Sequence, residues 1–249
     1  MTTKVDPVCK LILIGNGSVG KSSIIARFTD DGFGRVYKQT VGLDFFEKLL
    51  QIRGDRRVRL QVWDIGGQSI GSKMIGKYVY GSDIVFICYD VTDPKSFQDV
   101  EDWLRLVRKT FGAAKAAGVK KSPLVYLAGN KIDLYDQRRI TEDTHNAFVR
   151  DERLEGGFFC SAQSGESVLT CFYKAAADSL GVKLSANDLD FTRKALAVSI
   201  LEGDDSAKTA IADDVLAEQG MDEKFSLKDQ MAREDAARRK KKTKRCAVM

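Results

Sequence analysis

The stretch GNGSVGKS at residues 15–22 constrains this chain more than any other part of its sequence. It matches the pattern Gly-x-x-x-x-Gly-Lys-Ser, follows the apolar run at 10–14 and precedes the apolar segment at 23–28. Glycines let backbone N–H groups turn towards phosphate oxygens, and the N-terminus of a following helix attracts anions. We therefore expect a strand, a phosphate-binding loop and a helix, in this order.

Two side chains of this loop have expected roles beyond the backbone cradle. Lys21 should reach the β and γ phosphates of a nucleotide, as a catalytic as well as a binding residue, and the Ser22 hydroxyl should bind Mg²⁺. The residues expected to hold the phosphates are Gly15, Gly17, Ser18, Val19, Gly20, Lys21, Ser22 and Ser23.

Apolar runs and helical patterns alternate along the chain, which predicts a parallel sheet covered on both faces. The runs end at Gly15, Gly66, Asp90, Asn130 and Ala162. One exception is the stretch 44–63, where two strand-like segments flank Gly54-Asp55 and predict an edge hairpin. The expected fold is α/β: a doubly wound, mostly parallel six-stranded sheet of the P-loop NTPase type, with one antiparallel edge strand and a C-terminal extension. In such sheets ligands bind at the carboxyl ends of the strands.

The tetrapeptide NKID at 130–133 predicts which base is bound. A carboxylate at Asp133 can accept hydrogen bonds from N1–H and the exocyclic amine of guanine, whereas adenine offers no such pair, and a lost buried polar contact gives strong selection. Asn130 and Lys131 would hold the ring, and a backbone N–H of the Ser161-Ala162 pair would bind the guanine O6. The residues expected around the base are Phe33, packed on the purine, Asn130, Lys131, Asp133, Ser161, Ala162 and Gln163.

The segment WDIGGQ at 63–68 supplies groups for the triphosphate end. Asp64 and the Thr40 hydroxyl would complete the Mg²⁺ shell with Ser22, and the Gly67 N–H would sense the γ-phosphate. Gln68 is the expected catalytic residue that orients the attacking water. Because these groups depend on the γ-phosphate, its loss would release both loops, so we expect an order–disorder switch.

With these motifs in this order, the first 180 or so residues resemble the Ras superfamily of small GTPases. TVGLDFF at 40–46 resembles the Rab family, most closely the Rab twenty-eight subfamily. The resemblance implies GTP/GDP cycling in vesicle or endosomal trafficking, with an exchange factor, a GTPase-activating protein and Rab effectors as partners. Phe45, Trp63 and Tyr78 match the aromatic triad that contacts effectors, although ordinary core aromatics are the alternative.

Some residues depart from that family pattern. DIGGQS at 64–69 replaces the usual D-T-A-G-Q-E, SAQ at 161–163 replaces S-A-K, and the C-terminus has one cysteine where most Rabs have two. No arginine finger in cis is evident because Arg35 lies too early, so hydrolysis should be slow until a partner supplies a cation. Two alternatives stay open: a nucleotide-bound pseudo-GTPase scaffold, and a Ras- or Rho-like signalling GTPase.

The basic charge of the chain is local. Seven of its 40 Lys and Arg lie in RRKKKTKR at 238–245, which leaves 33 basic against 35 acidic residues elsewhere. A broadly basic face for nucleic acid is therefore not expected. The domains expected are a G domain at 1–184, a helical or disordered tail at 185–245 and a CaaX box at 246–249.

The last four residues, CAVM, fit a CaaX prenylation signal at Cys246, whose terminal Met indicates farnesyl. Together with the polybasic stretch, one lipid chain would give a stable, reversible membrane anchor, although a nuclear-localisation signal is the alternative. A prenyltransferase and a prenyl-binding chaperone are the implied partners. The expected location is the cytoplasmic face of endosomal or Golgi membranes, or the base of a cilium or flagellum, with a cytosolic pool.

Cysteine and histidine usage excludes other chemistry. The five cysteines show no metal-ligand spacing, and an odd count indicates free, mostly buried thiols. The single histidine, His145, makes Cys-His catalysis and histidine-based zinc sites unexpected. No apolar run reaches the length of a membrane span, and the N-terminal residues lack a secretory signal.

Overall fold

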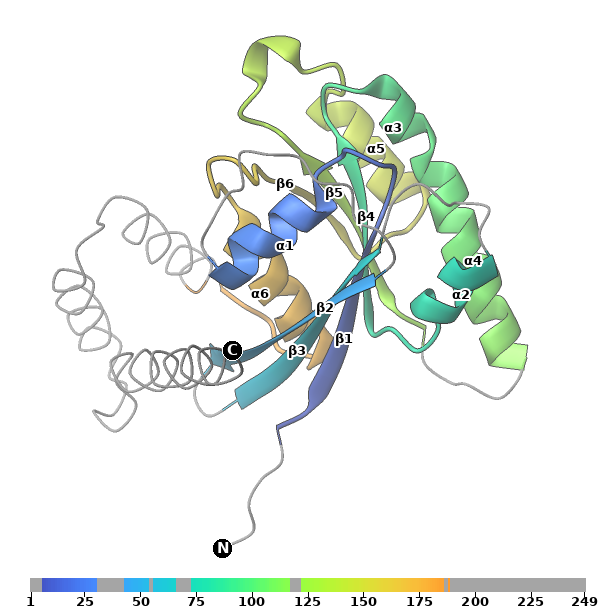
Figure 1. Cartoon of the computed structure of the whole chain (residues 1–249), viewed down its shortest axis with the longest axis vertical. Coiled ribbons are helices and arrows are strands. Elements are labelled where there is room, and N and C mark those ends of the chain that lie inside the picture. The colour runs from blue at the N-terminus through green and yellow to red at the C-terminus, as the bar shows by residue number, and fades with distance from the viewer. Residues whose placement is uncertain are drawn as a thin grey trace, which may run out of the picture. The chain divides into compact units, whose positions relative to one another are not determined.

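The computed structural model describes residues 6–30, 43–53, 56–65, 73–116, 122–185 and 188. Helices and strands alternate along them (Figure 1): β1 (Val8–Ile14), α1 (Lys21–Asp30), β2 (Leu43–Arg53), β3 (Arg56–Ile65), α2 (Lys73–Val79), β4 (Ile84–Asp90), α3 (Pro94–Gln98), α4 (Val100–Ala116), β5 (Leu124–Asn130), the 3-10 helix η1 (Tyr135–Gln137), α5 (Glu142–Asp151), β6 (Gly156–Phe159) and α6 (Val168–Ser179). In this part of the chain no helix is long and apolar enough to cross a membrane.

The strands form one six-stranded sheet in the order β2-β3-β1-β4-β5-β6. Strand β2 runs antiparallel to β3, and all other neighbours are parallel. The predicted fold class is therefore confirmed, including its antiparallel edge. Pairing of β2 with β3 continues to Arg53 and Arg56, on either side of the predicted hairpin turn.

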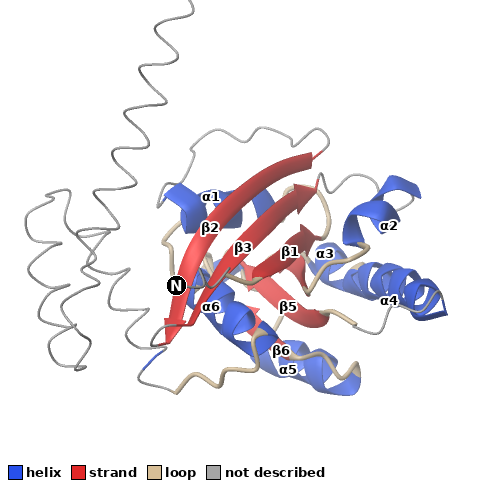
Figure 2. Ribbon diagram, turned by 90° about the horizontal axis from the view of Figure 1, so that it is seen from below, coloured by secondary structure: helices blue, strands red, loops and turns tan. Residues whose placement is uncertain are grey.

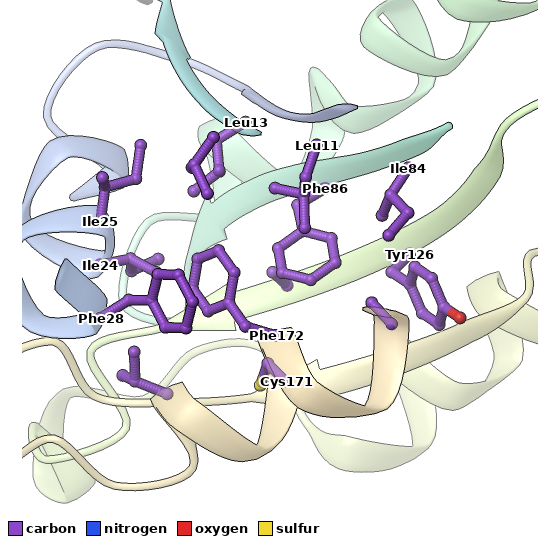
Figure 3. Close-up of a cluster of buried hydrophobic side chains, with 14 of the residues drawn as sticks. Leu11, Leu13, Ile24, Ile25, Phe28, Ile84, Phe86, Tyr126, Cys171 and Phe172 are labelled. Carbon is purple, nitrogen blue, oxygen red and sulfur yellow. The ribbon is translucent and has the colours of Figure 1, made fainter. Parts of the chain in front are cut away.

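Helices cover both faces of the sheet (Figure 2), as the nearly continuous apolar strands require. Helices α1 and α6 pack on one face, where the rings of Phe28 and Phe172 stack with centroids 3.9 Å apart and Phe86 lies against Phe172 (Figure 3). Helices α2, α4 and α5 pack on the other face around the buried Trp103. Four of the five cysteines are free and buried, as predicted, and Cys246 lies outside the described residues.

His145 of α5 is a core residue, with only 1% of its surface exposed. Its Nδ1 lies 2.9 Å from the Tyr89 hydroxyl on β4, and its ring lies 4.2 Å from that of Phe159. Burial, with a smaller contribution from the positive charge of Arg138, lowers the pKa of His145 from 6.5 to about 4. The folded protein therefore keeps this imidazole neutral at pH values where the unfolded chain protonates it.

This difference predicts an acid-sensitive core. Between pH 6.5 and about 4 the unfolded state binds the proton first, so the free energy of unfolding should fall as pH falls, by up to about 1.4 kcal/mol per pH unit from this one group. His145→Phe keeps a ring against Phe159 but cannot titrate. Chemical denaturation of both proteins from pH 7 to 4.5 should show a shallower decline for the variant, whereas parallel declines would contradict this assignment.

Candidate nucleotide-binding site

The loop between β1 and α1 needs glycine at two positions. Gly15 has a φ of +139°, and a Cβ there would lie 2.1 Å from the Cys88 carbonyl oxygen on β4. Gly20 has a φ of +93°, and a Cβ there would lie 2.3 Å from Asn130 Nδ2. The positive φ and the short distance together exclude a side chain at either position. The predicted cradle is therefore held tightly against the ends of β4 and β5.

Lys21 begins α1 beneath this loop and is only 6% exposed. Its Nζ donates hydrogen bonds to the carbonyl oxygens of Gly15, at 2.9 Å, and of Asn16, at 2.7 Å. Burial lowers the pKa of Lys21, while Cys88 and Asp64 oppose that shift. The ammonium is thus placed inside the loop, where phosphate oxygens would neutralise its charge.

Two of the three expected magnesium ligands belong to the described residues. Ser22 is exposed at the first turn of α1. Asp64 is buried near the end of β3, in register with Leu13 of β1, and lies close enough to Lys21 to affect its pKa. A hydroxyl and a carboxylate are oxygen ligands of the type that Mg²⁺ prefers, so these residues fit the ion.

Asn130 joins the phosphate loop to the loop after β6. It is 1% exposed, and its Nδ2 donates to the Val19 carbonyl oxygen at 2.9 Å. Its Oδ1 accepts a hydrogen bond from the Ala162 backbone N–H at 3.1 Å. The Ala162 N–H, one of the pair expected to bind a guanine O6, donates to Asn130 in this structure.

The other base-site residues gather at the same strand ends. Lys131 has a φ of +68° and its Nζ lies 2.6 Å from a carboxylate oxygen of Asp90. Asp133 accepts a hydrogen bond from the buried Ser161 hydroxyl at 2.5 Å. Ser161 therefore contributes its side chain, which orients the carboxylate, where the sequence had suggested only a backbone group.

Sequence reasoning missed two residues that support these loops. The guanidinium of Arg27, on α1, donates to the carbonyl oxygens of Ala162, at 3.0 Å, and of Gln163, at 2.5 Å. The side chain of Asn16 bonds to Asp99 and Trp103. The one available sequence signal for the role of Arg27 was its place among the apolar residues of SSIIARFT at 22–29. Asn16 occupies a position that the motif leaves open.

The three expected effector-contacting aromatics lie on neighbouring elements. Phe45 is 50% exposed, and its ring meets that of Trp63 edge-to-face, with centroids 5.7 Å apart. Lys10 links this pair to α2, because its Nζ lies 4.2 Å from the Trp63 ring centroid and donates to the Tyr78 carbonyl oxygen at 2.7 Å. Burial lowers the pKa of Lys10 and outweighs the opposite effect of the Asp83 carboxylate. Trp63 and Tyr78 are partly buried and pack against the core, so Phe45 is the exposed member of the three.

Five of the expected site residues lie outside the described residues: Phe33, Thr40, Gly67, Gln68 and Cys246. Their placement relative to the loops above stays a prediction, as does the organisation of the predicted tail beyond Ser185 and Asp188.

Comparison with known proteins agrees with this geometry. The Ras family model matches residues 10–180. Ras-related protein Rab-28 of Caenorhabditis elegans is 38% identical over 197 residues, which cover 79% of this chain and 77% of that protein. Ras-related protein Rab-13 of Rattus norvegicus is 33% identical, and that of Bos taurus 32%, each over 72% of this chain and 84% of the relative. The chain therefore belongs to the Ras family of small GTPases, in its Rab branch, whose members hydrolyse GTP.

Proposed function

We propose that this protein is a Rab-type molecular switch in vesicle or endosomal membrane trafficking, which recruits effectors when GTP is bound and hydrolyses that GTP slowly. The observation that carries the proposal is the convergence of three loops, where one buried side chain, Asn130, bonds to both the phosphate loop and the loop of the expected base site. Such a site suits a ligand with phosphates at one end and a base at the other.

Each end of the nucleotide would meet groups of matching chemistry. The N–H groups of the loop at 15–20 and the Lys21 ammonium would hold the phosphates, and the Asp133 carboxylate would accept from N1–H and the amine of guanine. The Ser161 hydroxyl, bonded to Asp133, would keep that carboxylate in place. Ser22, Asp64 and Thr40 would hold Mg²⁺, which would supply positive charge against the phosphates.

Hydrolysis would depend on Gln68, which would orient the water that attacks the γ-phosphate. The chain would reach only a slow rate by itself, and a GTPase-activating protein would supply a cation, a contribution of about 10³- to 10⁵-fold in this class of reaction. Ser18 is exposed beside Gly17 in the phosphate loop, so this edge of the site can admit a partner's side chain.

The state of the γ-phosphate would be communicated through the β2–β3 hairpin. The segment with Thr40 leads directly into β2, and the segment with Gly67 and Gln68 follows β3. Phe45 and Trp63 are paired residues on those two strands. A change in either loop would therefore alter the surface that an effector reads.

Membrane attachment would come from farnesylated Cys246 and the polybasic stretch at 238–245, a two-part anchor whose basic residues favour an anionic cytoplasmic leaflet. A prenyltransferase would add the lipid, a prenyl-binding chaperone would carry the cytosolic pool, and an exchange factor would reload GTP. Endosomal or Golgi membranes, or the base of a cilium or flagellum, are the proposed locations.

The assignment of Asp133 to the guanine base predicts that replacing this residue changes which base is bound. In Asp133→Asn the amide can still accept from Ser161, but its other end becomes a donor that opposes the guanine amine and suits the C2 carbonyl of xanthine. We expect GDP affinity to fall by about 10²- to 10⁴-fold and affinity for xanthosine diphosphate to rise, measured by competition against a fluorescent nucleotide. Unchanged GDP affinity would contradict the assignment of Asp133.

The aromatic surface predicts a separable effect on partner binding. Phe45→Ala should abolish capture of Rab effectors by the GTP-loaded protein while leaving GDP and GTP affinities unchanged, because Phe45 is half-exposed and its ring packs on Trp63, which is not one of the expected nucleotide-binding residues. Tyr135→Ala is the matched control, since it removes another exposed ring, 73% accessible, from η1. Equal loss of capture in both variants would argue against an effector role for Phe45.

A further inference from the structure

The side chain of Asn16, in the phosphate loop, bonds to the segment around the start of α4. Its Nδ2 donates to Asp99 Oδ2 at 2.8 Å, and its Oδ1 accepts from the Trp103 indole N–H at 2.9 Å. Trp103 belongs to α4, lies in the core and is 1% exposed. Both ends of the amide are therefore held, so the residue has one orientation.

Asp99 is itself fixed in place. It lies between α3 and α4, and its second oxygen, Oδ1, pairs with Lys95 at 2.5 Å. The hydrogen bonds from Lys95 and Asn16 keep the pKa of Asp99 below its ordinary value, so it accepts as a carboxylate near neutral pH. The acceptor for Asn16 is thus a charged group, which makes the bond stronger than a neutral one.

The backbone of the same residue faces the other way. The Asn16 carbonyl oxygen accepts a hydrogen bond from Lys21 Nζ at 2.7 Å, next to the Gly15 carbonyl at 2.9 Å. These two carbonyls determine where the buried ammonium lies. A residue whose side chain is anchored in α4 therefore sets one of the two oxygen positions that hold the phosphate-binding lysine.

We propose that Asn16 is a positioning residue for the phosphate site: its amide, clamped by Trp103 and Asp99, holds the loop so that Lys21 meets the phosphates in one geometry, and so lengthens the residence time of bound nucleotide. The inference rests on the proposed placement of the phosphates in the loop at 15–22. Within the described part of the chain, the hydrogen bonds of the clamp reach none of the base-site residues, so it acts on phosphate binding and not on base choice.

The test compares dissociation of fluorescent GDP in the full chain with Mg²⁺. Asn16→Ala and Trp103→Phe each remove a bond of the clamp, and each should speed release by about three- to thirtyfold. Arg105→Ala is the control, because it removes exposed ion pairs on α4 to Glu101 and Asp102 while leaving Asn16, Asp99 and Trp103 bonded, and its release rate should equal that of the wild type. The ratio of affinities for GDP and inosine diphosphate, which lacks the guanine amine, should stay unchanged in all variants.

A donor–acceptor exchange separates positioning from a general loss of structure. Asn16→Asp alone places two carboxylates together and should release GDP faster. Adding Asp99→Asn restores one donor and one acceptor with Trp103 still bonded, so the double variant should recover most of the wild-type residence time.

Three results would each overturn the inference. Asn16→Ala could release GDP at the wild-type rate, or the double variant Asn16→Asp with Asp99→Asn could fail to regain residence time. The third is a change in the ratio of affinities for GDP and inosine diphosphate. Absence of GDP binding by the wild-type protein would instead overturn the proposed function.

Discussion

Asn130 is the residue on which the organisation of the site depends, because its buried amide holds two loops at once. The distance between the phosphate loop and the loop at 161–163 is set by one side chain at the end of β5. This arrangement also explains the glycine at position 20, where any Cβ would collide with the same amide. Arg27 also holds the loop at 161–163, by bonds to two of its carbonyl oxygens. The phosphate loop and the loop at 161–163 are therefore held together by side chains of β5 and α1.

The β2–β3 edge of the sheet differs from the loops that Asn130 joins, because contacts of aromatic rings organise it. Strands β2 and β3 form the hairpin that joins both proposed switch segments, and Phe45 and Trp63 sit opposite each other on it. Lys10 connects this pair to the end of α2 through a cation–π contact and a bond to the Tyr78 carbonyl oxygen. In the proposed function, this hairpin would connect the state of the phosphates to the surface that a partner recognises.

Local sequence patterns predicted the sheet, its antiparallel edge and the strand-end position of the motifs, because apolar runs and glycine spacing act within a few residues. Bonds between distant positions were not accessible in this way. Asn16 meets Trp103, Arg27 meets Ala162, and His145 meets Tyr89 only after the chain has folded. The side-chain role of Ser161 was missed for the same reason, since its partner Asp133 comes from another loop. Motifs name the groups that touch a ligand, and the supporting bonds come from the topology.

Whether this protein is a cycling GTPase whose turnover depends on the segment after β3 can be measured by single-turnover hydrolysis of preloaded GTP with Mg²⁺, in the wild type and in Gln68→Leu. We expect slow hydrolysis in the wild type and a sharp decrease in the variant, with GTP affinity retained in both. Tight GTP binding with equal, negligible turnover in both proteins would contradict it and would indicate a nucleotide-bound scaffold.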